Sequence, residues 1–219
     1  MPLHVVRTPS NRVLWQACAD RFLTEATSRI TRHDAHIWLT HRLHRDLLLE
    51  VGAKRGMNGW LKPPVHFFSS LPDLFGITGK PIGLLTRREL ISRLASTHGT
   101  QSGIASRSIE ASLARGHMLH HFFCELLPEG ITLDQLENQL ARAEEDDFAA
   151  RRNAWVVATY RAYLDELRTN NQFDPRSIHA LIAHRINNGR LTDALDGAKR
   201  LHIYGLHSLR SRHALVNAL

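Results

Sequence analysis

Strand and helix patterns alternate through the first 75 residues, and this alternation constrains the fold more than any other feature. Each of three β-prone segments is followed by apolar residues at helical spacing. The three segments are residues 3–7, 36–40 and 65–68. The first helix can be capped by Ser10 or Asn11, the second is expected over residues 42–51, and a short third over 71–75. Because parallel strands need a crossover between them, this order predicts an α/β fold with a parallel sheet.

Residues 86–190 carry helical patterns alone, without a β-prone segment among them. The expected helices begin after a Thr86 cap and continue over residues 104–127, 133–143, 147–169 and 175–187. A β-prone segment returns at residues 201–204, and a last helix is expected over 210–219.

A helical block therefore interrupts a sheet-forming region. We expect three parts, which are residues 1–85, a helical insertion over 86–195, and a return strand and helix over 196–219.

The positive charge is concentrated in the first part of the chain. Residues 1–100 hold 14 basic and 7 acidic side chains, whereas residues 101–219 hold 14 of each, so the formal charge of +7 comes from the first part. Most of the basic residues are arginines, whose planar guanidinium groups suit phosphate. This asymmetry favours a polyanionic partner such as nucleic acid. A general bias toward arginine in the composition is the alternative explanation.

Other classes of protein are disfavoured by composition. Two cysteines, Cys18 and Cys124, are too few for a disulfide framework. The first residues lack the apolar core of a signal peptide, and no apolar run approaches the roughly 18 residues of a membrane span. We therefore expect a cytoplasmic protein without a membrane partner.

Four segments, taken in order, resemble the start of the inactivated superfamily I helicases. They are residues 36–42, 65–71, 160–164 with the Asp174-Pro175 pair, and 201–208. This group includes the B subunit of AddAB-type helicase–nucleases, RecC-like proteins and related PD-(D/E)XK nuclease-family repair proteins. The resemblance implies a P-loop NTPase-like (RecA-like) parallel sheet with a large all-helical insertion. It also implies loops that touch DNA after the second and third strands, with candidate contacts at Thr40, His41, Arg42, Arg45, Phe68, Ser69 and Ser70.

The nucleotide-binding motifs of active helicases are degenerate here. An active P-loop needs a glycine-rich turn and a lysine, and an active Walker B strand ends in acids that hold Mg²⁺. The loop that matches the first motif reads Pro9, Ser10, Asn11 and Arg12. The place that matches the second reads Gly205, Leu206, His207 and Ser208. Neither place keeps the required groups, so we expect no ATP hydrolysis, no cofactor and no bound metal. Residual ATPase activity remains a third hypothesis, which a phosphate-release assay would test.

The nuclease chemistry of the group is also missing from this sequence. It requires an acidic residue and an acid-x-lysine unit, and no acid stands two residues before any of the four lysines. In full-length relatives the nuclease lies far downstream. We therefore expect this sequence to be the N-terminal portion of a longer protein.

The sequence contains fifteen histidines and two adjacent serines that are further candidate sites. His117, His120 and His121 cluster on one predicted helix, but they do not match His-Glu-x-x-His, and solvated or locally bonded imidazoles are the favoured interpretation. Ser69 and Ser70 lack the Gly-x-Ser-x-Gly context of a nucleophile, so helix capping is expected.

The sequence thus favours a catalytically dead, helicase-like module that binds DNA within a helicase–nuclease of double-strand-break repair and recombination. Single-stranded DNA or a duplex end and an active helicase–nuclease subunit are the expected partners. A scaffold that docks onto such a subunit, with incidental DNA contact, is the alternative.

Overall fold

The computed structural model describes residues 10–26, 34–57, 60, 63–104, 108–143, 146–205 and 213–219. Its chain divides into two compact units. The first, here called the sheet unit, comprises Met1–Ile77, Ile182–Arg210 and Leu215–Leu219. The second, the helical unit, comprises Thr78–Leu181 and Ser211–Ala214. The strand predicted at residues 3–7 lies outside the described residues.

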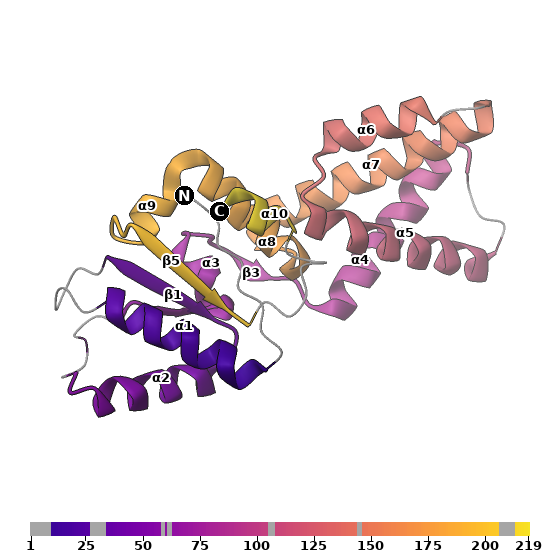
Figure 1. Ribbon diagram of the computed structural model, residues 1–219. Coiled ribbons are helices and arrows are strands. Elements are labelled where there is room, and N and C mark those ends of the chain that lie inside the picture. Colours follow the sequence, from indigo (N-terminus) through magenta and orange to yellow (C-terminus); the bar gives the residue numbers. More distant parts are fainter. Residues whose placement is uncertain are drawn as a thin grey trace. The chain divides into compact units, whose positions relative to one another are not determined.

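The sheet unit contains a small parallel sheet of three described strands (Figure 1). Strand β1 (Ala35–Leu39) lies in the centre, with β2 (Val65–Phe67) on one side and β5 (Arg200–Tyr204) on the other. Both pairings are parallel, with Ile37 opposite Val65 in one and opposite His202 in the other. The prediction of a parallel sheet that the chain re-enters after a helical block is confirmed for these strands.

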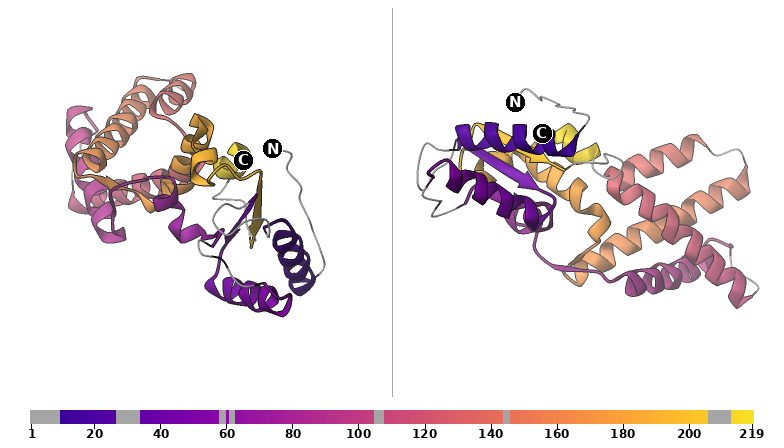
Figure 2. Two further views of the ribbon diagram at one scale, coloured as in Figure 1. Left: turned by 90° about the vertical axis from the view of Figure 1, so that its left-hand side faces the viewer. Right: turned by 60° about the horizontal axis from the view of Figure 1, so that its bottom comes forward.

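Helices α1 (Asn11–Glu25) and α2 (Arg42–Lys54) lie side by side against one face of this sheet (Figures 1 and 2). Their apolar side chains pack with alternate residues of β1, namely Ala35, Ile37 and Leu39. On the other face, Trp38 contacts the rings of Phe68 and Phe75. All five residues of β1 are buried, which is expected of a central parallel strand covered on both faces.

Shorter elements complete the sheet unit. They are a 3₁₀ turn at Phe68–Ser70, α3 (Leu71–Leu74), a kinked segment at Ile186–Arg190, α9 (Leu191–Ala194) and most of α10 (His213–Ala218). The kink is at Asn188 and Gly189, which has a φ of 81°, close to the predicted helix stop.

The helical unit is built on four long helices (Figure 1). They are α4 (Leu84–Gln101), α5 (Ile109–Glu129), α6 (Leu133–Arg142) and α7 (Asp147–Thr169). A 3₁₀ turn at Pro175–Ser177 leads into α8 (Ile178–Arg185), which continues into the sheet unit. Their shared core includes Leu119, Phe123, Trp155, Tyr160 and Tyr163, all at most 2% exposed.

Three details of the predicted helical block are wrong. The cap of α4 is Gly83 rather than Thr86, and α5 begins after Ser108, whose hydroxyl accepts from the Ala111 amide, instead of at residue 104. The block also contains a strand, because β4 (Gln172–Phe173) pairs in parallel with β3 (Lys80–Pro81). Two-residue strands are too short to show the period of two that identifies a strand in a sequence.

None of the described helices combines the length and the apolar character that crossing a membrane requires.

The Glu25 carboxylate ties the end of α1 to β5. It lies 2.7 Å from Nε2 of His202, 2.8 Å from a guanidinium nitrogen of Arg200 and 3.3 Å from Nε of Arg21. Burial alone would raise the pKa of Glu25, but His202, Arg21 and Arg200 outweigh it and hold the pKa below its ordinary value of 4.5.

We expect Glu25→Gln to destabilise the protein at neutral pH and to matter progressively less in acid. A carboxylate whose pKa is lower in the folded state stabilises the fold at pH values above its unfolded-state pKa. This stabilisation is lost as the pH falls through the folded-state pKa. The stability difference between wild type and variant should therefore shrink as the pH drops below 4.5. Urea unfolding at several pH values measures this, with the exposed Glu129→Gln as control. A difference independent of pH would contradict the role of the carboxylate charge.

Candidate functional site

The carboxyl ends of the three parallel strands meet at one edge of the sheet, where open α/β folds usually bind ligands. Thr40 follows β1, Phe68 follows β2 and Gly205 follows β5. Gly205 has a φ of 90°, and a Cβ atom at this position would overlap the Thr40 hydroxyl. Two candidate residues that are 165 positions apart therefore meet, because the Gly205 backbone lies against the Thr40 side chain.

Helix α2 begins at this edge. His41 caps it, since its Nδ1 accepts a hydrogen bond from the Leu43 amide at 3.1 Å. Arg42 is the exposed first residue of the helix. Arg45, three residues on, pairs with Asp46 at 2.9 Å and lies 5.8 Å from the Phe67 ring centroid. The positive end of the helix dipole and two arginines thus share one location.

Helix α1 begins at the same edge. The Tyr204 hydroxyl, at the end of β5, donates to the carbonyl of Asn11 at 3.3 Å. The rings of Trp15, His44 and Tyr204 pack against one another, with centroids 4.9 to 5.2 Å apart. This aromatic cluster joins α1, α2 and β5, so residues 10–12, including the exposed Arg12, lie close to the strand ends.

The loop after β2 holds its serines in different ways. The Ser70 hydroxyl donates to the Phe67 carbonyl at 3.0 Å and accepts from the Phe67 amide at 3.2 Å. Ser70 therefore closes the turn, as the capping interpretation expected, whereas Ser69 is exposed. Phe68 is half-buried against Trp38.

Four candidate residues of the two degenerate motifs lie outside the described residues. They are Pro9, Leu206, His207 and Ser208. The structure therefore describes the remainder of these motifs, which is residues 10–12 and Gly205.

The described part of this edge can bind an anion. It offers the positive ends of two helix dipoles, the guanidinium groups of Arg12, Arg42 and Arg45, and the Ser69 hydroxyl. Such donors suit the phosphates of an extended polyanion. Asp46 is the carboxylate beside them, and it is paired with Arg45.

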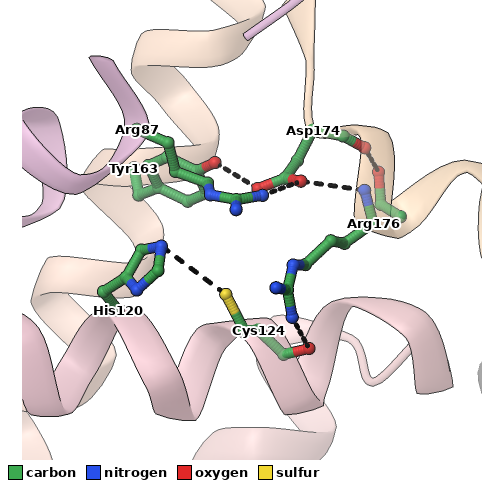
Figure 3. Close-up of polar contacts among 7 residues, drawn as sticks. Arg87, His120, Cys124, Tyr163, Asp174 and Arg176 are labelled. Atoms are coloured by element: carbon green, nitrogen blue, oxygen red, sulfur yellow. Dashed lines mark hydrogen bonds and ion pairs between the residues drawn. The ribbon is translucent and has the colours of Figure 1, made fainter. Parts of the chain in front are cut away.

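A second polar cluster lies inside the helical unit, and its centre is Asp174 (Figure 3). This fully buried carboxylate accepts hydrogen bonds from Arg87 at 2.8 Å, from the Tyr163 hydroxyl at 2.6 Å and from the Arg176 amide at 2.9 Å. Burial, followed by the adjacent charge of Asp174, raises the pKa of Tyr163 far above its ordinary value, so this hydroxyl stays a donor.

The neighbouring Cys124 and His120 do not form a reactive thiolate pair. Their sulfur and Nε2 atoms lie 3.7 Å apart on consecutive turns of α5 (Figure 3). Burial raises the pKa of the thiol, and burial together with Arg87 and Arg88 lowers the pKa of His120 to about 4. The thiol is therefore protonated and the imidazole neutral at pH 7, and Cys124 is only 6% exposed.

Sequence reasoning missed the Arg87–Asp174 pair. Asp174 stands directly before the helix expected over residues 175–187, and its capping bond to the Arg176 amide fits that position. Nothing in the sequence connects it to Arg87, which lies 87 positions away. Within the described ranges, no three His, Cys, Asp or Glu side chains come close enough to form a metal site.

No protein-family model matches this chain. No curated protein matches it either.

Proposed function

We propose that this chain is a non-catalytic DNA-binding module with the architecture of an inactivated superfamily I helicase motor domain, a P-loop-like parallel sheet interrupted by a helical block. It would serve in a helicase–nuclease that processes double-strand breaks. DNA phosphates would contact the loops after β1 and β2 through Thr40, His41, Arg42, Arg45 and Ser69.

One observation carries this proposal. The strand ends, two helix starts and three arginines come together at a single edge, although residues 10–12, 40–45 and 205 are far apart in the sequence. The edge supplies positive charge and hydrogen-bond donors for a backbone of phosphates. By the resemblance, residues 205–208 match the place where active motors keep the Walker B acids, and they include no carboxylate, so the proposal assigns binding without hydrolysis.

We expect the double variant Arg42→Gln/Arg45→Gln to bind single-stranded DNA more weakly and with a smaller salt dependence. Each lost phosphate contact on a single strand reduces the slope of log K against log salt by roughly 0.7, so two contacts give about 1.4. Fluorescence anisotropy with a labelled oligonucleotide across a salt series measures both quantities.

Arg142→Gln/Arg151→Gln is the matched control, because both residues are exposed arginines of the helical unit, on α6 and α7. It removes the same number of charges from residues that do not belong to the proposed edge. Wild-type binding that is undetectable at low salt, or a double variant with the same slope as the control, would contradict the proposal.

Docking onto an active motor subunit is the second candidate function. Large apolar side chains are exposed on the helical unit, namely Ile109 at 77%, Leu113 at 60% and Met118 at 52% on α5, with Phe148 at 58% on α7. Ile109 and Leu113 are four positions apart, so they share one face of α5, and an exposed apolar face is typical of an interaction site. If docking is the main role, Leu113→Glu should abolish co-purification with the motor subunit while DNA binding persists.

A further inference from the structure

His117 and His121 present two imidazole nitrogens to the same point beside α5. The residues are four positions apart, and both side chains are exposed. Their Nε2 atoms lie 3.2 Å apart, with ring centroids 4.4 Å apart and ring planes at 75°. In the neutral state, one ring can donate its Nε2 proton to the other nitrogen.

The same separation suits a shared metal ion. Zinc binds histidine nitrogen at roughly 2.0–2.1 Å, so an ion equidistant from two nitrogens 3.2 Å apart subtends an N–metal–N angle of about 100°. That angle lies between the tetrahedral and octahedral values. Histidines four positions apart on one helix also supply two of the ligands in zinc metalloprotease helices.

We propose that His117 and His121 form a bidentate clamp for a divalent transition-metal ion such as Zn²⁺, with water at the remaining positions. Met118 follows His117 where the metalloprotease motif has its catalytic glutamate, so the clamp binds metal without activating water for hydrolysis. This site lies in the helical unit and does not depend on the proposed DNA-binding function.

The surroundings of the pair are compatible with a cation. His117 lies in a groove of about 790 Å³ between α4 and α5 that Arg88, Glu89 and Arg93 also line, and Arg93 is paired with Glu166 at 3.3 Å. His120 is buried and directs its Nε2 toward Cys124, so it is not counted as a ligand. When metal binds, the imidazole that donated its Nε2 proton holds that proton on Nδ1 instead, which frees both Nε2 lone pairs.

Calorimetric titration of the full chain with ZnCl₂ tests the clamp. We expect a saturable site in the wild type that MgCl₂ does not fill, because magnesium prefers oxygen ligands. His117→Ala and His121→Ala should each weaken this site at least about tenfold, since changes even in the outer shell of a metal site cost roughly 10–100-fold. Thermal unfolding gives a second readout, because a ligand bound only to the folded state raises the melting temperature.

His98→Ala is the matched control. His98 is a histidine on α4 that bonds Gln101 at 2.9 Å, so its removal should leave the zinc site unchanged. The proposal is overturned if the wild type shows no saturable zinc binding. It is equally overturned if the His117→Ala/His121→Ala double variant binds as many zinc equivalents with the same affinity.

Discussion

Asp174→Asn is expected to destabilise the protein by about 3–5 kcal/mol, the range found when one partner of a buried ion pair is removed. The Arg87 and Asp174 side chains are 6% and 0% exposed, so the variant leaves a guanidinium charge away from water without its counter-charge. The amide of the new side chain would also place a donor where Tyr163, Arg87 or the Arg176 amide already donates. Urea or thermal unfolding followed by circular dichroism measures the loss.

Two controls separate this effect from the loss of any carboxylate. Asp165 pairs with Arg168 on the surface, with side chains 52% and 80% exposed, so Asp165→Asn should cost no more than about 1 kcal/mol. Arg87→Met combined with Asp174→Asn should recover part of the loss, because no buried charge then lacks a partner. Equal costs for Asp174→Asn and Asp165→Asn would show that the buried pair does not stabilise the fold.

The parts of the fold that could be predicted are those whose cause is local. Helix α7 begins at Asp147 and ends at Thr169, as predicted, because Asp146 caps its first amides and apolar residues repeat along it. Strand β1 was predicted from a compact run of β-prone residues. The start of α5 was misplaced by five residues because a residue with apolar character, Ile104, precedes the true Ser108 cap.

The candidate site was predictable where topology alone brings residues together. Once strands are parallel, the residues after β1 and β5 must share an edge, which is why Thr40 and Gly205 meet. The Tyr204–Asn11 and Arg87–Asp174 contacts depend on how the helices pack in three dimensions. No motif in the sequence links the two residues of either pair. The sequence shows that His117 and His121 are four positions apart. It does not predict the side-chain rotamers that bring their Nε2 atoms within 3.2 Å of each other.

Gly116→Ala is expected to destabilise the helical unit by about 1–3 kcal/mol, although alanine is the better helix former by roughly 1 kcal/mol. A Cβ atom at Gly116 would lie 2.8 Å from both Cα and Cβ of Ser92 and would overlap the Ser92 hydroxyl. The Cα atom belongs to the backbone of α4, so rotating a side chain cannot relieve the clash, and the two helices must move apart. The core between α4, α5 and α7 would then lose contacts around Ile91, Leu119 and Trp155.

Gly52→Ala is the matched control for this prediction. Gly52 is also inside a helix, but its added Cβ would meet only side chains, the Met57 sulfur at 3.5 Å and Cδ2 of Leu23 at 3.7 Å, and both distances are ordinary van der Waals contacts. We therefore expect Gly52→Ala to be neutral or to stabilise by up to about 1 kcal/mol, opposite in sign to Gly116→Ala. Urea unfolding of both variants measures the two signs. If both substitutions stabilise, α4 and α5 do not approach each other closely enough at Gly116 to exclude a methyl group.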